Sequence, residues 1–102
     1  MKKNMIIVGA GLAGLSAALQ AVKEGCSVKL ISSLPSERAQ SVMAEGGINA
    51  ALNTKGEDDS TQEHYEDTIK AGCNLADPNA VWNMTQAAPE VVTWLHSIGV
   101  QF

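Results

Sequence analysis

The sequence predicts an α/β fold that begins with a strand–helix–strand unit of parallel strands and continues with helices. Three observations predict it: a continuous apolar run at residues 4–8, a glycine-rich turn directly after it, and two later stretches in which apolar residues recur with helical spacing. An uninterrupted apolar run is typical of a buried parallel strand, and parallel strands need a crossover such as a helix between them. The 102 residues are enough for one domain, since domains typically have about 100–150 residues.

The crossover helix and the second strand follow directly. Residues 12–24 favour a helix whose alanines allow close packing, and Gly25 suits its C-terminal end. Residues 27–31 alternate between apolar and polar side chains, which predicts a second strand. A right-handed parallel crossover is therefore expected.

The remaining chain predicts loops and then two helical stretches. Residues 32–38 form a polar loop, residues 39–52 are small residues around a glycine pair, and residues 53–60 form an acidic turn. Ser60 or Thr61 suits the N-cap of a helix over residues 61–72.

A last helical stretch starts at Asp77-Pro78, with Asp as N-cap and Pro at the first helical position. Pro89 either kinks this helix or starts a second one after Ala88. Gly99 closes the stretch. Six apolar positions fall on one predicted face: Val81, Met84, Ala88, Val91, Leu95 and Ile98.

Composition excludes several classes of protein. The net charge of −4 and the absence of a basic stripe argue against a nucleic-acid partner. The longest apolar run, residues 5–8, is far shorter than the roughly 20 residues of a membrane helix, so no transmembrane segment is expected. Cys26 and Cys73 form neither a CxxC pair nor a metal cluster, which indicates reduced cytosolic thiols and no metal site. We therefore expect a cytoplasmic protein.

The sharpest chemical signal is the sequence Gly9-Ala10-Gly11-Leu12-Ala13-Gly14 between the first strand and the helix. Gly9 permits the tight turn, Gly11 lets the backbone approach a pyrophosphate, and Gly14 lets the helix pack close to the strand. The amide groups of the first helical turn and the helix dipole then favour phosphate. The context of strand, turn, helix and strand predicts a Rossmann-like dinucleotide site.

The end of the second strand departs from the usual dinucleotide pattern. An acidic residue normally follows there to hold the ribose, but this chain has Ser32 and Ser33. A serine hydroxyl can still bind a ribose hydroxyl. This difference disfavours NAD and is compatible with FAD. Further along, Gly46-Gly47 would let a flat ring or a phosphate come close to the backbone.

Five stretches, in this order, resemble the N-terminus of the fumarate reductase/succinate dehydrogenase flavoprotein family, to which L-aspartate oxidases also belong: MIIVGAGLAGLSAAL, AQSVMAEGGINAAL, HYEDTIKAG, APEVVTWL and IGVQF. The resemblance covers nearly the whole chain. It implies that residues 1–102 are the N-terminal part of a Rossmann-type FAD-binding domain, with no second domain. It also implies an oxidoreductase that passes a hydride between flavin and a small dicarboxylate.

The resemblance implies a set of cofactor-binding residues. The pyrophosphate would lie over the glycine turn, the adenosine ribose near the two serines, and the flavin end near residues 38–47. The residues are Gly9, Ala10, Gly11, Leu12, Ala13, Gly14, Ser32, Ser33, Arg38, Ser41, Ala44, Glu45, Gly46 and Gly47.

Two departures from the family follow from the resemblance. Membrane-bound members carry a histidine covalently attached to flavin in the pattern Arg-Ser-His-Thr, and the matching stretch here is Arg38-Ala39-Gln40-Ser41. Gln40 cannot form that bond, so non-covalent FAD is expected. Family members are also much longer, so we expect this chain to be a fragment that is inactive alone. No catalytic residue is assigned, because the family's substrate-binding residues lie outside it.

The family also implies an iron–sulfur subunit as a partner and a location at the cytoplasmic membrane face through it. Alternatives remain: a segment of an L-aspartate oxidase, or a non-catalytic nucleotide-binding or self-associating module. Open sheet edges and apolar faces predict that the fragment self-associates. His64 and His96 are expected on helix surfaces, and Trp82 and Trp94 in a core or an interface.

Overall fold

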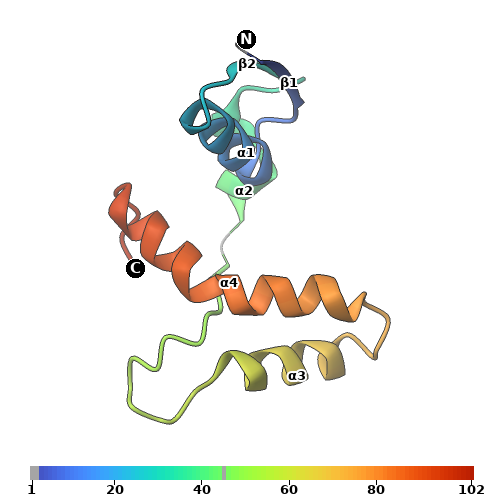
Figure 1. Ribbon diagram of the computed structural model, residues 1–102, viewed down its shortest axis with the longest axis vertical. Coiled ribbons are helices and arrows are strands. Elements are labelled where there is room, and N and C mark those ends of the chain that lie inside the picture. Colours follow the sequence, from blue (N-terminus) through green and yellow to red (C-terminus); the bar gives the residue numbers. More distant parts are fainter. Residues whose placement is uncertain (1–2, 45) are drawn as a thin grey trace. The chain divides into compact units, whose positions relative to one another are not determined.

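The computed structural model describes residues 3–44 and 46–102. These residues form two compact units, one ending at Gly46 and one beginning at Gly47. Figure 1 traces the chain through both units.

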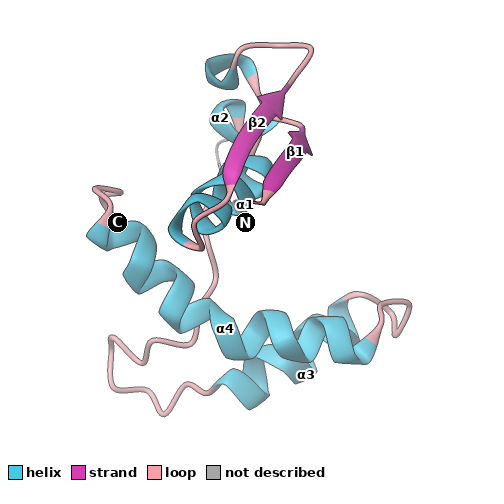
Figure 2. Cartoon of the chain, turned by 45° about the horizontal axis from the view of Figure 1, so that its top comes forward, coloured by secondary structure: helices cyan, strands magenta, loops and turns pink. Residues whose placement is uncertain are grey.

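The first unit contains the predicted strand–helix–strand arrangement. Strand β1 (Asn4–Val8) is followed by helix α1 (Leu12–Lys23) and strand β2 (Ser27–Ile31). The strands pair in parallel, in a register that sets Asn4 opposite Ser27 and Val8 opposite Ile31, as Figure 2 shows. The predicted fold class, a Rossmann-like start of a parallel sheet followed by helices, is confirmed.

Helix α1 packs on the sheet through its small residues. Ala21 is buried, and Gly14 and Ala18 are half-buried. A side-chain carbon built on Gly14 would lie 3.7 Å from a methyl group of Ile7, so the helix and strand backbones are close. The large apolar side chains of α1 are exposed: Leu12, Leu15, Leu19 and Val22.

Two short elements that the sequence did not predict follow β2. They are a 3-10 turn, η1 (Ser36–Arg38), and a four-residue helix, α2 (Gln40–Met43). Pro35 precedes the turn with φ −55° and accepts a hydrogen bond from the Arg38 amide. Because such short elements are held by local backbone hydrogen bonds, they leave no apolar periodicity in the sequence from which they could be predicted.

The second unit is a helical hairpin of α3 (Thr61–Ala71) and α4 (Pro78–Ser97), which lie side by side (Figures 1 and 2). Both predicted caps are confirmed. The Ser60 hydroxyl accepts from the Glu63 amide at 3.1 Å, and the Asp77 carboxylate accepts from the Asn79 amide at 2.8 Å. Between the helices, the Thr61 hydroxyl lies 2.8 Å from the Gln86 side-chain oxygen.

Helix α4 buries only part of the predicted face: Val81 and Leu95 are buried as predicted, and Ala88 is half-buried. Its buried residues are Val81, Thr85, Val92 and Leu95, whereas Met84, Val91 and Ile98 are exposed. Thr85 has an exposed fraction of 0%, and its hydroxyl donates to the Trp82 carbonyl at 3.1 Å. Because its polar group is satisfied within its own helix, Thr85 can occupy the core beside α3.

Pro89 lies inside α4 and does not end it. Figure 1 shows α4 bending along its length, as expected where proline removes one backbone hydrogen bond. Of the two options that the sequence left open, the single kinked helix is correct. Among residues 3–44 and 46–102, no helix is both long and apolar enough to cross a membrane.

Candidate functional site

The turn between β1 and α1 has the geometry that its glycines allow. Gly9 has φ +110°, a conformation that residues with a side chain rarely adopt. Its amide donates to the Ile31 carbonyl at 2.7 Å. That hydrogen bond extends the pairing of β1 with β2 by one residue, so the turn is held at the carboxyl end of the sheet.

Gly14 lies where the first turn of α1 passes the backbone of Gly9. A side-chain carbon built on Gly14 would overlap the Gly9 carbonyl oxygen. The overlapping atoms belong to the backbone, which cannot move aside as easily as the end of a flexible side chain. Glycine is therefore required here for the close approach of helix and turn.

The N-terminus of α1 faces Ser41 of α2. Gly11 is the N-cap and has no side chain of its own to cap the helix. Instead, the Leu12 amide donates to Ser41 Oγ at 3.0 Å. A carbon built on Gly11 would lie 3.2 Å from the same oxygen. The first-turn amides of an α-helix have no partner within the helix, so this end can bind an anion as well as a hydroxyl.

Ser32 and Ser33 follow β2 directly. Because Val8 and Ile31 are opposite each other in the parallel register, both serines lie at the same edge of the sheet as the glycine turn. Both are exposed. The Ser32 hydroxyl accepts from the Leu34 amide at 3.4 Å.

The remaining predicted site residues lie beyond β2. Arg38 ends η1 and Ala44 follows α2, and both are exposed. Glu45 lies outside the described residues. Gly46 is exposed at the end of the first unit, and Gly47 is exposed at the start of the second. The structure thus brings together the glycine turn, the two serines and Ser41, within the first unit.

This arrangement fits the pyrophosphate and ribose of a dinucleotide. Nothing lies within 4 Å of where a side chain on Gly9 would begin, and Gly11 adds no side chain at the amide end of the twelve-residue helix. Hydroxyl groups rather than a carboxylate follow β2, so a ribose there would meet neutral partners. The contact of Ser41 with Leu12 was missed from the sequence, since 29 residues separate them and no periodicity links them.

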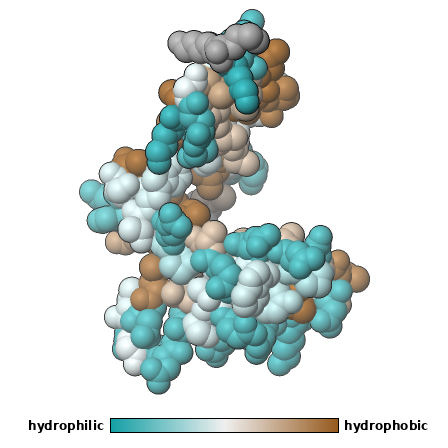
Figure 3. Space-filling view, in the orientation of Figure 1, coloured by the Kyte–Doolittle hydropathy of each residue, from teal (hydrophilic) through white to brown (hydrophobic). Residues whose placement is uncertain are grey.

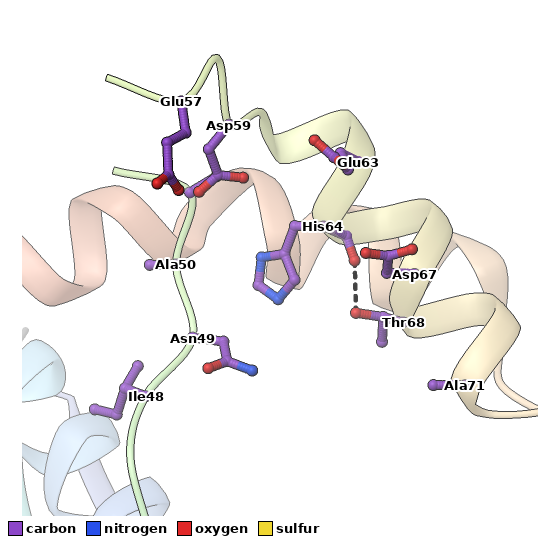
Figure 4. Close-up of a pocket in the computed structure, with 11 residues that line it drawn as sticks. Ile48, Asn49, Ala50, Glu57, Asp59, Glu63, His64, Asp67, Thr68 and Ala71 are labelled. Atoms are coloured by element: carbon purple, nitrogen blue, oxygen red, sulfur yellow. Dashed lines mark hydrogen bonds between the residues drawn. The ribbon is translucent and has the colours of Figure 1, made fainter. Parts of the chain in front are cut away.

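A separate cavity of about 620 Å³ lies in the second unit. Figure 4 shows it between the segment around Asn49 and helix α3, with acidic side chains around it. The charged lining residues are Glu57, Asp59, Glu63 and Asp67. Among the described residues, no three histidine, cysteine or acidic side chains are arranged to hold a metal ion.

His64 lines this cavity and corrects one prediction. It is half-buried rather than solvent-facing, because α3 turns it toward the segment at Asn49 (Figure 4). Its Nδ1 is buried and has no hydrogen-bond partner in the described part of the chain. His96 is exposed on α4, as predicted. Trp82 stacks edge-to-face on Tyr65, with ring centroids 5.3 Å apart.

Comparison with known protein families gives a match to one family, described as FAD binding domain, over residues 4–102. Three relatives illustrate the range of similar proteins. The chain is 48% identical to a succinate dehydrogenase flavoprotein subunit of Bacillus subtilis, over 99% of this chain and 17% of the relative. It is 35% identical to an NADH:fumarate oxidoreductase of Klebsiella pneumoniae, over 95% of this chain and 11% of the relative.

The third relative is an L-aspartate oxidase of Caulobacter vibrioides, 43% identical over 95% of this chain and 19% of the relative. The chain therefore spans less than a fifth of the length of each of these relatives. The matched region includes the glycine turn and every other predicted site residue.

Proposed function

The chain belongs to the FAD binding domain family, and on that premise we propose that it forms the pyrophosphate-binding part of a flavin-dependent oxidoreductase that interconverts fumarate and succinate. The observation that supports this most is the glycine turn. Gly9 has open space where its side chain would begin, and Gly11 adds no side chain at the N-terminus of α1, and FAD is the cofactor that the family binds. We further propose that residues 1–102 are the N-terminal part of one FAD-binding domain.

The chain's own residues would bind and orient the cofactor. The glycine turn and the α1 amides would hold the pyrophosphate, and Ser32 and Ser33 would hold the adenosine ribose. The segment from Arg38 to Gly47, with Ala44 and Glu45, would lie along the flavin end. FAD supplies the group that accepts or donates a hydride; the residues here set where it lies. A small dicarboxylate would be the substrate.

Two relatives carry names that point to this chemistry, the succinate dehydrogenase flavoprotein subunit and the NADH:fumarate oxidoreductase. By analogy we propose an iron–sulfur subunit as partner, and a position on the cytoplasmic membrane face through that subunit. L-aspartate oxidation is the second candidate, because the similarity to the aspartate oxidase, at 43%, is comparable.

The activity is tested on the protein expressed from its complete reading frame and loaded with FAD. Fumarate reduction by a reduced dye, succinate oxidation and aspartate oxidation are measured side by side. We expect turnover with fumarate and succinate and at most a trace with aspartate. Turnover with aspartate alone would establish the second candidate in place of the first.

We propose that FAD is held without a covalent bond. Gln40 stands where the resemblance places a flavin-linked histidine, and its amide nitrogen is a poor nucleophile compared with an imidazole nitrogen. Gln40 is exposed at the start of α2. Acid precipitation of the FAD-loaded protein should release the flavin into the supernatant. Yellow colour that stays in the washed pellet would contradict this.

We also propose that the 102-residue chain by itself self-associates. Its two-stranded sheet has two outer edges, and Ile6 and Val8 are exposed on β1. Figure 3 shows hydrophobic residues gathered around the strand end of the first unit. Exposed edges and apolar patches favour pairing with another chain. Size-exclusion chromatography with light scattering should give a mass above 10.7 kDa; a monomer at all concentrations would contradict it.

A further inference from the structure

Ser41 links two segments of the first unit that are far apart in the sequence. Its Oγ accepts a hydrogen bond from the Leu12 amide at 3.0 Å, across 29 residues. Leu12 is the first residue of α1, directly after the glycine turn. Ser41 is the second residue of α2, directly after Gln40. The phosphate turn and the segment after β2 therefore meet at one hydroxyl.

The absence of a side chain at Gly11 makes this contact possible. A carbon at Gly11 would lie 3.2 Å from Ser41 Oγ, closer than an ordinary van der Waals contact. The backbone of Gly11 is extended, with φ −81° and ψ −174°, a conformation open to any residue. A side chain at Gly11 would therefore press against Ser41 Oγ, which would have to shift by a few tenths of an ångström.

Helix α2 needs such an anchor. It has only four residues, and its side chains are exposed. A helix this short is unstable by itself, since nucleation is not offset by enough hydrogen bonds. Its backbone bonds are local, such as the Ala44 amide to the Gln40 carbonyl at 3.0 Å. The hydrogen bond from Leu12 gives α2 a fixed position against α1.

We propose that Ser41 is a positioning residue that sets the distance between the phosphate turn and residues 39–44. This rests on the proposed function, in which the pyrophosphate lies at the turn and the flavin end lies along this segment. The Ser41 hydroxyl acts on the cofactor through the position of residues 39–44, which its hydrogen bond from the Leu12 amide fixes against α1. Loss of the hydroxyl would then leave the phosphate subsite formed but the flavin end misplaced.

The test compares FAD with ADP, because ADP carries the adenosine and both phosphates but no flavin. Affinities are measured by calorimetry on the protein from the complete reading frame, stripped of cofactor. For Ser41→Ala we expect FAD to bind at least tenfold more weakly and ADP less than threefold more weakly. The visible circular dichroism of the bound flavin should also change. Ser41→Thr, which keeps the hydroxyl, should have the FAD affinity and the flavin spectrum of the unsubstituted protein.

The matched control is Ser97→Ala, which removes a hydroxyl that donates to the Trp94 carbonyl of its own helix. It should leave both affinities unchanged. If Ser41→Ala does not fold, Ser41→Cys keeps the shape with a poorer acceptor and should show the same selective loss of FAD affinity.

Two results would overturn the positioning role. Equal losses for FAD and ADP would make Ser41 an ordinary phosphate contact, and no loss for either would remove it from the site. If the unsubstituted protein binds neither FAD nor ADP, the proposed function itself fails, and that result is distinct from the other two.

Discussion

The strand–helix–strand unit and the helical hairpin use their helices in opposite ways. Helix α1 packs through glycine and alanine and exposes its large apolar side chains, so that Leu19 is 54% exposed. Helix α4 packs through its large side chains, and Leu95 is 6% exposed. The first unit is thus fixed by backbone approach and hydrogen bonds, and the second by burial of side chains. The candidate site lies in the first unit, where close backbone contacts fix the geometry. This unit also has the smaller core, since its buried apolar residues are Ala10 and Ala21 only among those described.

The contrast between α1 and α4 shows that an apolar stripe in the sequence does not by itself tell whether that helix face is buried. Both helices carry an apolar stripe in the sequence, but only in α4 is such a face buried within the chain. The first unit depends on a few positions where no side chain fits. The second depends on a set of side chains, each of which contributes separately.

Gly14→Ala tests the close approach of helix and turn on which the first unit depends. In a free helix alanine would stabilise by about 1 kcal/mol relative to glycine. Here the added carbon would overlap the Gly9 carbonyl oxygen, and overpacking against backbone is expected to destabilise by about 3 kcal/mol, the upper end of the usual range. Thermal unfolding followed by far-UV circular dichroism measures the change.

The control for Gly14→Ala is Ala17→Gly, at an exposed position on the same helix. It should destabilise by about 1 kcal/mol through helix propensity alone. If Gly14→Ala instead raised the unfolding temperature, the close approach at the turn would be wrong.

A pair of leucine variants tests the contrast between the two helices. Leu95→Ala removes a buried side chain and should destabilise the hairpin by about 2–5 kcal/mol. Leu19→Ala removes a side chain that is 54% exposed and should cost less than about 1 kcal/mol. Both are measured by urea unfolding of the 102-residue chain at a concentration where its mass is constant. Equal costs would mean that the outer face of α1 is covered in the folded chain.

Much of the fold could be predicted from local signals. The apolar run before Gly9 and the alternation at Ser27–Ile31 predicted both strands, and the caps Ser60 and Asp77 predicted where two helices begin. Each of these signals lies in the element itself or within a few residues of it, so a short stretch of sequence is enough to predict the element.

The rest depends on partners that are distant in the sequence. The buried face of α4 includes Thr85 instead of Met84 because α3 determines which residues are covered. His64 is half-buried because a remote segment lies against it. The Ser41–Leu12 hydrogen bond joins the ends of two helices, α1 and α2, that no periodicity connects. The positions of the glycine turn and of Ser32 and Ser33 at one edge of the sheet could be predicted, while the contact between Ser41 and the first residue of α1 needed the structure.

The central claim is that the turn from Gly9 to Gly14 and the amide end of α1 hold the FAD pyrophosphate. Titration of FAD into Gly11→Val, made in the protein from the complete reading frame and stripped of cofactor, tests it most directly. The branched side chain would occupy the space beside Ser41 Oγ, where we propose that the phosphates bind, while the extended Gly11 backbone tolerates it. Ala17→Val, exposed on the same helix, is the control and should bind FAD like the parent. We expect Gly11→Val to keep its far-UV spectrum and to bind FAD at least about 100-fold more weakly, or about 2.8 kcal/mol; binding as tight as the parent's would contradict the claim.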